Sequence, residues 1–372
     1  MANWPTRTLS DLFDIQKGKI GIKAATPGEY PLVTTGEAHQ SHNEAHFSGD
    51  ALCIPMISAT GHGHASIKRL HHIEGRFSVG SILCACIAKD PKRISARYFY
   101  YYLTALKDEL LTPLMQGSAN VSLRMGDVAS VEVPLPPINH QMEVVRKLDS
   151  LRSACLQLNE HLDRSDACGR ELLQTRFQAA TSAAPLKTMA DIAPLVRREV
   201  QIEPNARYTE LGIRSFFKGT FHRRVVSGSE FTWQRMYAVK EQDLIFSNIM
   251  AWEEAIALAG PQDNGCLGNH RMLTCVPDGT QILPEFLYYY FTTPEGFAKI
   301  YAASPGTAAR NRTLMSGSLE EIRVPVPSLS VQKTFVDLFS SIDAMKQMHD
   351  TLRDSNSQLL PATLAQIFED ID

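Results

Sequence analysis

The stretch VPLPPINHQ, from Val133 to Gln141, returns 191 positions later as VPVPSLSVQ, from Val324 to Gln332. In each copy a V-P-x-P segment, whose prolines favour extended backbone, leads directly into a long pattern typical of a helix. An internal repeat defines the architecture before any other feature does. The chain of 372 residues therefore divides into two similar halves, each a globular segment followed by a helix.

The similarity extends on both sides of this motif, whereas residues 20–85 and 200–275 show almost none. A common frame therefore carries two different inserts. The matched pairs are Arg97–Leu103 with Glu285–Phe291, Met125 with Met315, Thr8–Leu12 with Thr188–Ile192 and, more weakly, Leu172–Phe177 with Leu359–Leu364.

The repeat divides the chain into four segments. Residues 1–137 and 185–328 have the lengths of ordinary globular domains, and residues 138–184 and 329–372 read as spacer helices. Short apolar runs at 81–87, 243–246 and 272–276 predict strands, and aromatic-rich segments predict helices over 98–111 and 285–301. Because consecutive aromatics point all round a helix, we expect most of them to be core rather than base-stacking platforms. The predicted fold class is α+β.

Both spacer segments carry apolar residues at alternating spacings of three and four, the pattern of a coiled coil. Each could run about 40 residues, or roughly 60 Å at 1.5 Å per residue. A helix that long needs a partner, so we expect the two to pair antiparallel in a pseudo-twofold arrangement. An alternative is that each helix packs back on its own domain. The predicted contact positions are Leu148, Leu151, Leu158, Leu162, Phe335, Leu338, Ile342, Met345, Leu352 and Leu359, with Val144 and Cys155 in the same pattern and His349 and Asn356 as polar members.

Composition limits the class of protein. Hydrophobic content of 44% and charged content of 21% are globular values, and no apolar run is long enough for a membrane span. Seven cysteines without disulfide-like spacing fit a reducing compartment, so a cytoplasmic location is expected. The net charge of −3 does not itself argue for nucleic-acid binding, which would require positive charge gathered on one face.

Several catalytic motifs are missing from the sequence. There is no G-x-x-x-x-G-K-[ST] phosphate loop and no G-x-G-x-x-G after a strand. There is also no N/D-P-P-[YF] tetrapeptide, which amino-methyltransferases use to hold a flipped base. We therefore predict a non-catalytic chain with no cofactor.

Histidines are concentrated in the first half, with seven of the twelve between His39 and His72. Zinc sites need nitrogen and sulfur ligands at close, regular spacing, and His62-Gly63-His64 is shorter than the usual gap. We favour solvated or base-contacting histidines and predict no metal site. A metal-dependent nuclease that uses the His39–His72 cluster is an alternative.

Basic and amide side chains give the candidate DNA contacts. The segment 214–224 places arginines and a lysine among aromatics, as in phosphate-contacting loops. The pairs Asn120/Arg124 and Asn311/Arg312 occupy the same place in their halves, and Arg and Asn make bidentate contacts to guanine and adenine edges. The full candidate set is Arg214, Lys218, Arg223, Arg224, Arg310, Asn311, Arg312, Asn120, Arg124, Lys17, Lys19, Lys68 and Arg69.

The duplicated motif also has a family likeness. With Gly117-Ser118 ahead of Val131–Gln141, and Gly306-Thr307 ahead of Ile322–Gln332, the chain resembles the specificity (S) subunits of type I restriction-modification systems over nearly all its length. The resemblance implies two target-recognition domains that each read half of a split sequence in double-stranded DNA. It also implies that the paired helices set the gap between the half-sites and dock two adenine-methyltransferase (M) subunits and the restriction (R) subunits. A coiled-coil adaptor that does not touch DNA is a further alternative.

Overall fold

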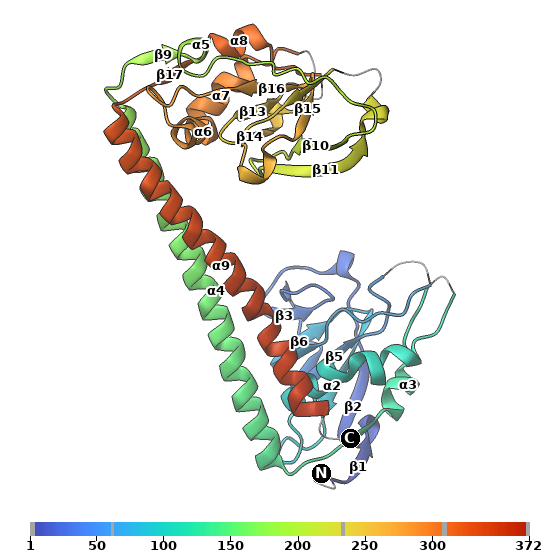
Figure 1. The fold of residues 1–372 in the computed structure, drawn as a ribbon. Helices are drawn as coiled ribbons and strands as arrows, with labels where there is room; N and C mark the ends of the chain where they lie inside the picture. Colours follow the sequence, from blue (N-terminus) through green and yellow to red (C-terminus); the bar gives the residue numbers. More distant parts are fainter. Residues whose placement is uncertain (1–3, 61–62, 119, 232–234, 307–310, 370–372) are drawn as a thin grey trace. The chain divides into compact units, whose positions relative to one another are not determined.

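The computed structural model describes residues 4–60, 63–118, 120–231, 235–306 and 311–369 (Figure 1). The chain forms two compact units, the first built from two parts of the sequence and the second from one continuous part. Unit 1 combines Met1–Leu162 with His349–Asp372, and unit 2 spans Asp163–Met348. Each unit holds a mixed α/β globular part and a stretch of both long helices, so the predicted fold class is confirmed.

Unit 1 is built on a six-stranded sheet that is antiparallel except where β3 runs parallel to β6. Helix α2 (Ala96–Leu110) packs against this sheet and buries its aromatic residues there, as expected. In spatial order the strands are β2 (Phe13–Lys17), β7 (Leu83–Ala88), β5 (Phe47–Pro55), β6 (His71–Val79), β3 (Tyr30–Val33) and β4 (Gln40–His42).

Unit 1 also contains a two-stranded ribbon, in which β1 (Thr6–Thr8) pairs antiparallel with β8 (Glu132–Pro134). Strand β8 includes the first half of the V-P-x-P segment. Thr8 and Asp11 form a capping box for α1, whose reciprocal hydrogen bonds fix the direction in which the chain leaves the ribbon. The remaining elements are α1 (Leu9–Leu12), α3 (Met125–Ser130) and the 3₁₀ turns η1 (Ile22–Ala24) and η2 (Thr112–Leu114).

Unit 2 repeats the ribbon but divides its sheet. The ribbon pairs β9 (Leu186–Thr188) with β17 (Arg323–Pro325), next to α5 (Met189–Ile192) and α8 (Ser316–Glu320). One sheet orders β11 (Thr220–Ser227), β10 (Arg207–Ile213), β15 (Leu267–Asn269) and β12 (Met236–Ala238), and the other orders β14 (Ile256–Leu258), β13 (Leu244–Ser247) and β16 (Met272–Cys275). The 3₁₀ turns are η3 (Gly228–Phe231), η4 (Ala251–Glu253) and η5 (Pro261–Asp263).

The helix predicted over 285–301 is two helices, α6 (Pro284–Thr292) and α7 (Pro294–Ala302). Pro294 has no amide hydrogen and fits only the first turn of a helix. The hydroxyl of Thr293 accepts a hydrogen bond from Gly296 N at 3.2 Å and caps the new helix. The single-helix prediction was wrong because it ignored this Thr-Pro start signal.

The two units share backbone hydrogen bonds even within residues 20–85 and 200–275, which show almost no sequence similarity. In unit 1, Leu123 N donates to Met56 O at 2.8 Å, and Met56 N donates to Ile82 O at 2.8 Å. In unit 2, Leu314 N donates to Asn248 O at 2.7 Å, and Asn248 N donates to Arg271 O at 2.8 Å. In both units these residues stand at the ends of two paired antiparallel strands, β5 and β7 or β13 and β16.

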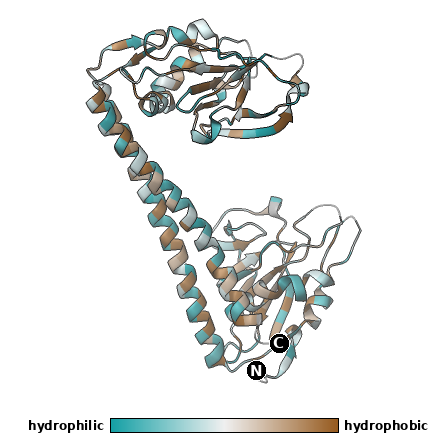
Figure 2. Cartoon of the chain, viewed as in Figure 1, coloured by the Kyte–Doolittle hydropathy of each residue, from teal (hydrophilic) through white to brown (hydrophobic). Residues whose placement is uncertain are grey.

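The long helices are α4 (Ile138–Thr181, 44 residues) and α9 (Leu329–Glu369, 41 residues), and both carry hydrophilic and hydrophobic residues along their length (Figure 2). In unit 2 the side chains of Ile342 and Met345 lie against the Gly169 backbone. In unit 1, Asn356 Nδ2 donates to Cys155 O at 2.9 Å. Phe177 of α4 packs on Phe335 of α9, so α4 advances from Gly169 to Phe177 while its partner goes back from Ile342 to Phe335, and the two helices pair antiparallel, as predicted.

The heptad pattern misplaces the last part of α9. Leu352 and Leu359 are 41% and 48% exposed, whereas the side chains buried beyond Asn356 are those of Leu364 and Phe368. In unit 1 this end of α9 packs on the globular core as well as on α4, so the contact face follows the 3.6-residue period of a straight helix. The other predicted contact positions range from buried to partly exposed.

The end of each long helix inserts an aromatic ring into a globular core. Phe368 packs on Tyr98 and Tyr102 of α2 in unit 1, and Phe177 packs on Phe286 and Tyr289 of α6 in unit 2. Phe177 and Phe368 are 191 positions apart, the offset of the V-P-x-P motif. The weaker match of Leu172–Phe177 with Leu359–Leu364 was thus displaced by one helical turn.

Among the described residues, no helix is long and apolar enough to cross a membrane. The cytoplasmic location stays a prediction.

Candidate nucleic-acid interface

Basic side chains of unit 1 gather at one end of the six-stranded sheet. Lys17 is the last residue of β2, β5 ends at Pro55, and β6 begins at His71. The strand registers place these three residues in neighbouring rows of the sheet. The connection between β5 and β6 leaves the sheet at the same end, which is therefore the place of Lys17, Lys19, Lys68 and Arg69.

A loop of residues 116–124 docks onto this end of the sheet. Ser58 N donates to Val121 O at 2.9 Å, beside the Leu123–Met56 bond described above. Gly117 has φ of 132°, and a Cβ there would lie 2.3 Å from Asn120 O, so the tight turn needs glycine. Asn120 and Arg124 are exposed on this loop.

Two of the basic residues in unit 1 have partners within the chain. The ammonium of Lys19 lies 5.2 Å from the centre of the Phe47 ring, and Arg69 Nη1 lies 3.3 Å from Glu37 Oε2. Glu37 is largely exposed, so solvent weakens this ion pair. Both cations can exchange such partners for a phosphate at little cost.

The equivalent segment of unit 2 also contains a close approach between a glycine and a later residue. Gly306 approaches Asn311 O so closely that a Cβ would lie 2.4 Å from that oxygen. Asn311 is exposed, as Asn120 is in unit 1. Arg310 lies outside the described residues.

Arg312 is held against the end of helix α7. Its guanidinium stacks on Tyr301 at 3.9 Å from the ring centre, and its Nη1 donates to Ser304 O at 3.0 Å. A side chain engaged in this way is less available to a DNA base. Arg312 is therefore a weaker candidate for base contact than its sequence pattern suggested.

The turn between β10 and β11 has an unusual backbone. Phe216 and Phe217 have φ of 63° and 51°, a region that bulky side chains rarely adopt. Their amides donate to Glu253 O and Glu254 O at 3.0 Å each, which holds the turn in place. Phe216 is 62% exposed, and Lys218 Nζ lies 5.9 Å from its ring centre. The turn therefore presents an aromatic ring and a cation to solvent.

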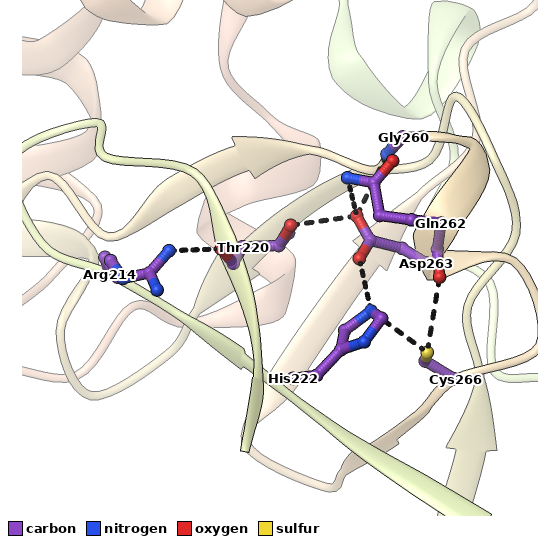
Figure 3. A network of polar contacts seen from close by, with 7 residues as sticks. All are labelled: Arg214, Thr220, His222, Gly260, Gln262, Asp263 and Cys266. Carbon is purple, nitrogen blue, oxygen red and sulfur yellow. Dashed lines mark hydrogen bonds and ion pairs between the residues drawn. The ribbon is translucent and has the colours of Figure 1, made fainter. Parts of the chain in front are cut away.

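A polar network holds the base of this hairpin (Figure 3). The fully buried Asp263 accepts hydrogen bonds from Thr220 Oγ1 at 2.9 Å and Gly260 N at 3.0 Å, and it lies 3.2 Å from His222 Nε2. Arg214 Nη1 donates to Thr220 O at 2.5 Å. The network ties β11 to η5 and aims the Arg214 side chain along the hairpin.

The network is not a catalytic triad, although it contains Cys266, His222 and Asp263. His222 Nε2 faces both Asp263 and Cys266 Sγ, at 3.2 and 3.7 Å, whereas a triad needs the two ring nitrogens to face different partners. Burial raises the pKa of the Cys266 thiol, which disfavours the nucleophilic thiolate.

Arg223 and Arg224 both pair with Glu210 of β10. The Arg223 Nη1 to Glu210 Oε1 distance is 3.3 Å, and Arg224 Nε donates to Glu210 Oε2 at 2.9 Å. The hydrogen bond and charge of Glu210 raise the pKa of the Arg224 guanidinium. Arg224 Nη1 also lies 3.5 Å from Glu230 Oε2, so two carboxylates balance the two arginines in this part of the hairpin.

The structure adds Asn269 and Arg271, which the sequence analysis missed. Together with Arg223, Ser247 and Ile249 they line a groove beside the β10–β11 hairpin. Arg271 is exposed and forms no ion pair within the described part of the chain. Arg271 O also accepts the Asn248 amide that connects this groove to the 311–314 loop. No sequence motif marks the two residues, since a single Asn and a single Arg in a turn are common.

The histidines of the first half do not form one cluster. The His39 and His71 rings meet edge to face at 5.6 Å, and His72 Nε2 lies 2.7 Å from Asp50 Oδ1. His42 stacks on His46 at 5.7 Å. His64 is exposed, and His62 lies outside the described residues.

The fold is that of a protein with two mixed α/β domains and two long helices that pack together. The model of the type I restriction modification DNA specificity domain family matches residues 1–164 and 216–354. The chain belongs to this family. It is a specificity subunit, the non-catalytic member of a type I restriction-modification complex that recognises the DNA target. The nuclease and adaptor alternatives are therefore not supported.

Individual relatives agree with this assignment. A protein named as a type I restriction enzyme specificity subunit in Haemophilus influenzae is 21% identical over 75% of this chain and 71% of its own length. The S subunit structure from M. genitalium has a TM-score of 0.53 at 17% identity, covering 96% of this chain and 95% of that one. A chain from a structure that concerns complex assembly and conformational transition of the type I R-M system has a TM-score of 0.61 at 14% identity, covering 99% and 98%.

Proposed function

We propose that residues 1–137 and 185–328 are two target-recognition domains that each read one half of a split sequence in double-stranded DNA. One observation carries this proposal. In both units the amide of Leu123 or of its counterpart Leu314 donates the same backbone hydrogen bond to the residue that follows a central strand, while the side chains around it differ. A common frame with different surface side chains is what reading two unlike half-sites requires.

The DNA-contacting surface of unit 1 is the end of its sheet that carries Lys17, Lys19, Lys68, Arg69, Asn120 and Arg124. Lysines and arginines there neutralise phosphates, and the exposed amide of Asn120 can make two hydrogen bonds to an adenine edge. These side chains come from three separate segments that the sheet topology brings to one end. Because the net charge of the chain is −3, DNA binding requires positive charge to be gathered on one face. The convergence of these side chains supplies that charge.

The DNA-contacting surface of unit 2 is the groove lined by Arg223, Asn269 and Arg271, flanked by the β10–β11 turn. Arg214 stacks over the Phe221 ring at 5.0 Å, and Phe221 itself lines the groove. The turn and the groove are therefore one continuous surface. Phe216, held outward by strained backbone, supplies an apolar face that can stack on a base or sugar.

The long helices fix the gap between the two half-sites and form the docking surface for the other subunits. These partners are two adenine-methyltransferase subunits and the restriction subunits. Paired helices suit a spacer because their backbone hydrogen bonds and mutual packing make them stiffer than an irregular linker. Asn356, bonded to Cys155 O and to Asn159 Oδ1 at 3.0 Å, supports a fixed register, since a buried polar residue favours one alignment.

Exchange of residues 185–328 for the second recognition domain of another specificity subunit tests the proposal. The chimaera, assembled with its methyltransferase subunits, should methylate a target in which only one half-site has changed. Sequencing of methylated genomic DNA gives both half-sites at once. A chimaera whose two half-sites both change would contradict independent reading, and exchange of residues 1–137 is the reciprocal control.

A further inference from the structure

Three side chains of unit 1 have the composition and spacing of a divalent-cation site. A ring nitrogen of His42, a carboxylate oxygen of Glu44 and a ring nitrogen of His46 all lie within 4.8 Å of one another. His42 ends the edge strand β4, and the other two residues lie in the short connection to β5. We propose that His42, Glu44 and His46 bind one Zn²⁺ ion, a role independent of the DNA contacts proposed above.

The hydrogen bonds around His46 determine which ring nitrogen is free. The hydroxyl of Ser78 donates to Glu44 O at 2.6 Å, so the same hydroxyl must accept from His46 Nδ1, 2.8 Å away. His46 Nδ1 therefore carries the hydrogen, and Nε2 of the neutral ring carries the lone pair. Metal-binding histidines are held in this way, with the other ring nitrogen donating to an oxygen.

The free nitrogen of His46 faces a carboxylate. His46 Nε2 lies 3.5 Å from Glu44 Oε2. A lone pair and a carboxylate oxygen repel each other unless a positive ion lies between them. Two ligand atoms about 2 Å from a tetrahedral Zn²⁺ are about 3.3 Å apart, so this pair is already close to the required separation.

His42 completes the set from a buried position. Its Nδ1 lies 3.2 Å from Thr26 O and 3.3 Å from Thr26 N, so the ring can adopt either neutral tautomer where it stands. With Nδ1 donating to Thr26 O, Nε2 is available as a ligand. Two imidazoles and one carboxylate suit Zn²⁺, and the exposed side chain of Glu44 can close the remaining distance.

The competing occupant of the His46–Glu44 gap is a proton, which would make an ordinary imidazolium–carboxylate pair. A shared proton would involve only His46 and Glu44, whereas a bound metal ion would also be coordinated by His42. The cation would fix the β4–β5 connection to the segment before β3 through Thr26 and to β6 through Ser78. The occupant can therefore be identified by binding and by its effect on stability.

The test is titration of the chelator-treated full-length chain with Zn²⁺ by calorimetry, and with Co²⁺ by visible absorption. The proposal expects one site, bound at least tenfold more weakly by Glu44→Gln and His46→Gln, and a Zn²⁺-dependent rise in melting temperature that both variants lose. Glu44 is exposed, so its variant folds. His64→Gln, which changes an exposed histidine outside the trio, should bind like the parent chain. Absence of binding at 100-fold excess over protein, or binding that both variants retain, would overturn the proposal.

Discussion

Gln141 and Gln332 make the same three hydrogen bonds, each within its own unit. Gln141 Nε2 donates to Pro136 O at 2.8 Å and Arg93 O at 3.0 Å, and its Oε1 accepts from Ser95 N at 2.9 Å. Gln332 Nε2 donates to Pro327 O and Gln281 O, and its Oε1 accepts from Leu283 N at 2.8 Å. Both side chains are fully buried. Each glutamine fastens the V-P-x-P segment and the start of a long helix to the start of the aromatic helix.

Gln141→Ala should destabilise unit 1 by about 3 kcal/mol, because three hydrogen bonds worth about 1 kcal/mol each are lost and their partners stay buried. Hydrogen exchange of the α2 amides during urea unfolding measures the effect on this unit. Gln157→Ala, at an exposed position of the same helix, is the matched control and should change stability by less than about 0.5 kcal/mol. Equal exchange in the two variants would refute the anchoring role.

Phe177→Ala and Phe368→Ala should each cost about 3–5 kcal/mol, the usual loss for a buried aromatic. Each change should loosen its own unit, as seen by hydrogen exchange. The controls are Leu172→Ala and Leu359→Ala, which truncate residues that are 41% and 48% exposed on the same helices. If Leu359→Ala proved as damaging as Phe368→Ala, the heptad assignment would be right and the observed contact face wrong.

Repetition and periodicity made most of the fold predictable. The duplicated motif marks the two ribbons, the two glutamines and the starts of α4 and α9, because each copy must satisfy the same local geometry. The pairing of the helices followed from their length, since neither has a core of its own. The buried face of the last part of α9 could not be predicted from the heptad pattern, because Phe368 packs on Tyr98 and Tyr102 of the globular core.

The candidate interface was less predictable. Sequence pattern identified the basic 214–224 segment, but only the structure shows that Arg312 is stacked on Tyr301 and that Arg271 lies beside the hairpin. The equivalence of the β5–β7 strand pair with the β13–β16 strand pair could not be predicted from the sequence either. Backbone hydrogen bonds such as Leu123–Met56 and Leu314–Asn248 make no demand on side-chain identity, so no sequence similarity survives there.

Acid should weaken unit 1 through His71. Burial, together with the nearby charges of His39 and Arg69, lowers the pKa of His71 from 6.5 to about 4. Between these two values the unfolded chain binds a proton that the folded unit refuses, so the free energy of unfolding falls as the pH falls from 6.5 towards 4 and is unaffected above 6.5. The loss is at most about 3 kcal/mol.

His71→Phe keeps an aromatic ring and removes the titrating group, so this variant should lose less stability between pH 6.5 and 4 than the parent chain. His64→Gln, at an exposed position, should keep the parent pH dependence. Urea unfolding at a series of pH values measures the difference. Identical curves for the parent chain and His71→Phe would exclude His71 as the source.

Arg271→Ala should weaken DNA binding by the assembled complex by about 1–3 kcal/mol, the usual value of an arginine–base contact. The loss should depend on the half-site read by unit 2 and should leave discrimination at the other half-site unchanged. Arg207→Ala, an exposed change at the other end of β10, is the control and should bind normally. Binding to duplexes mutated in one half-site at a time, at fixed salt, distinguishes these outcomes.

The length of the paired helices is the most direct test of the account. Deletion of one heptad from each helix, residues 156–162 of α4 and 349–355 of α9, removes about 10 Å from each helix without changing their register. Sequencing of the sites methylated by the assembled complex should show the same two half-sites with a gap shorter by about three base pairs. An unchanged gap, or altered bases within either half-site, would contradict the account.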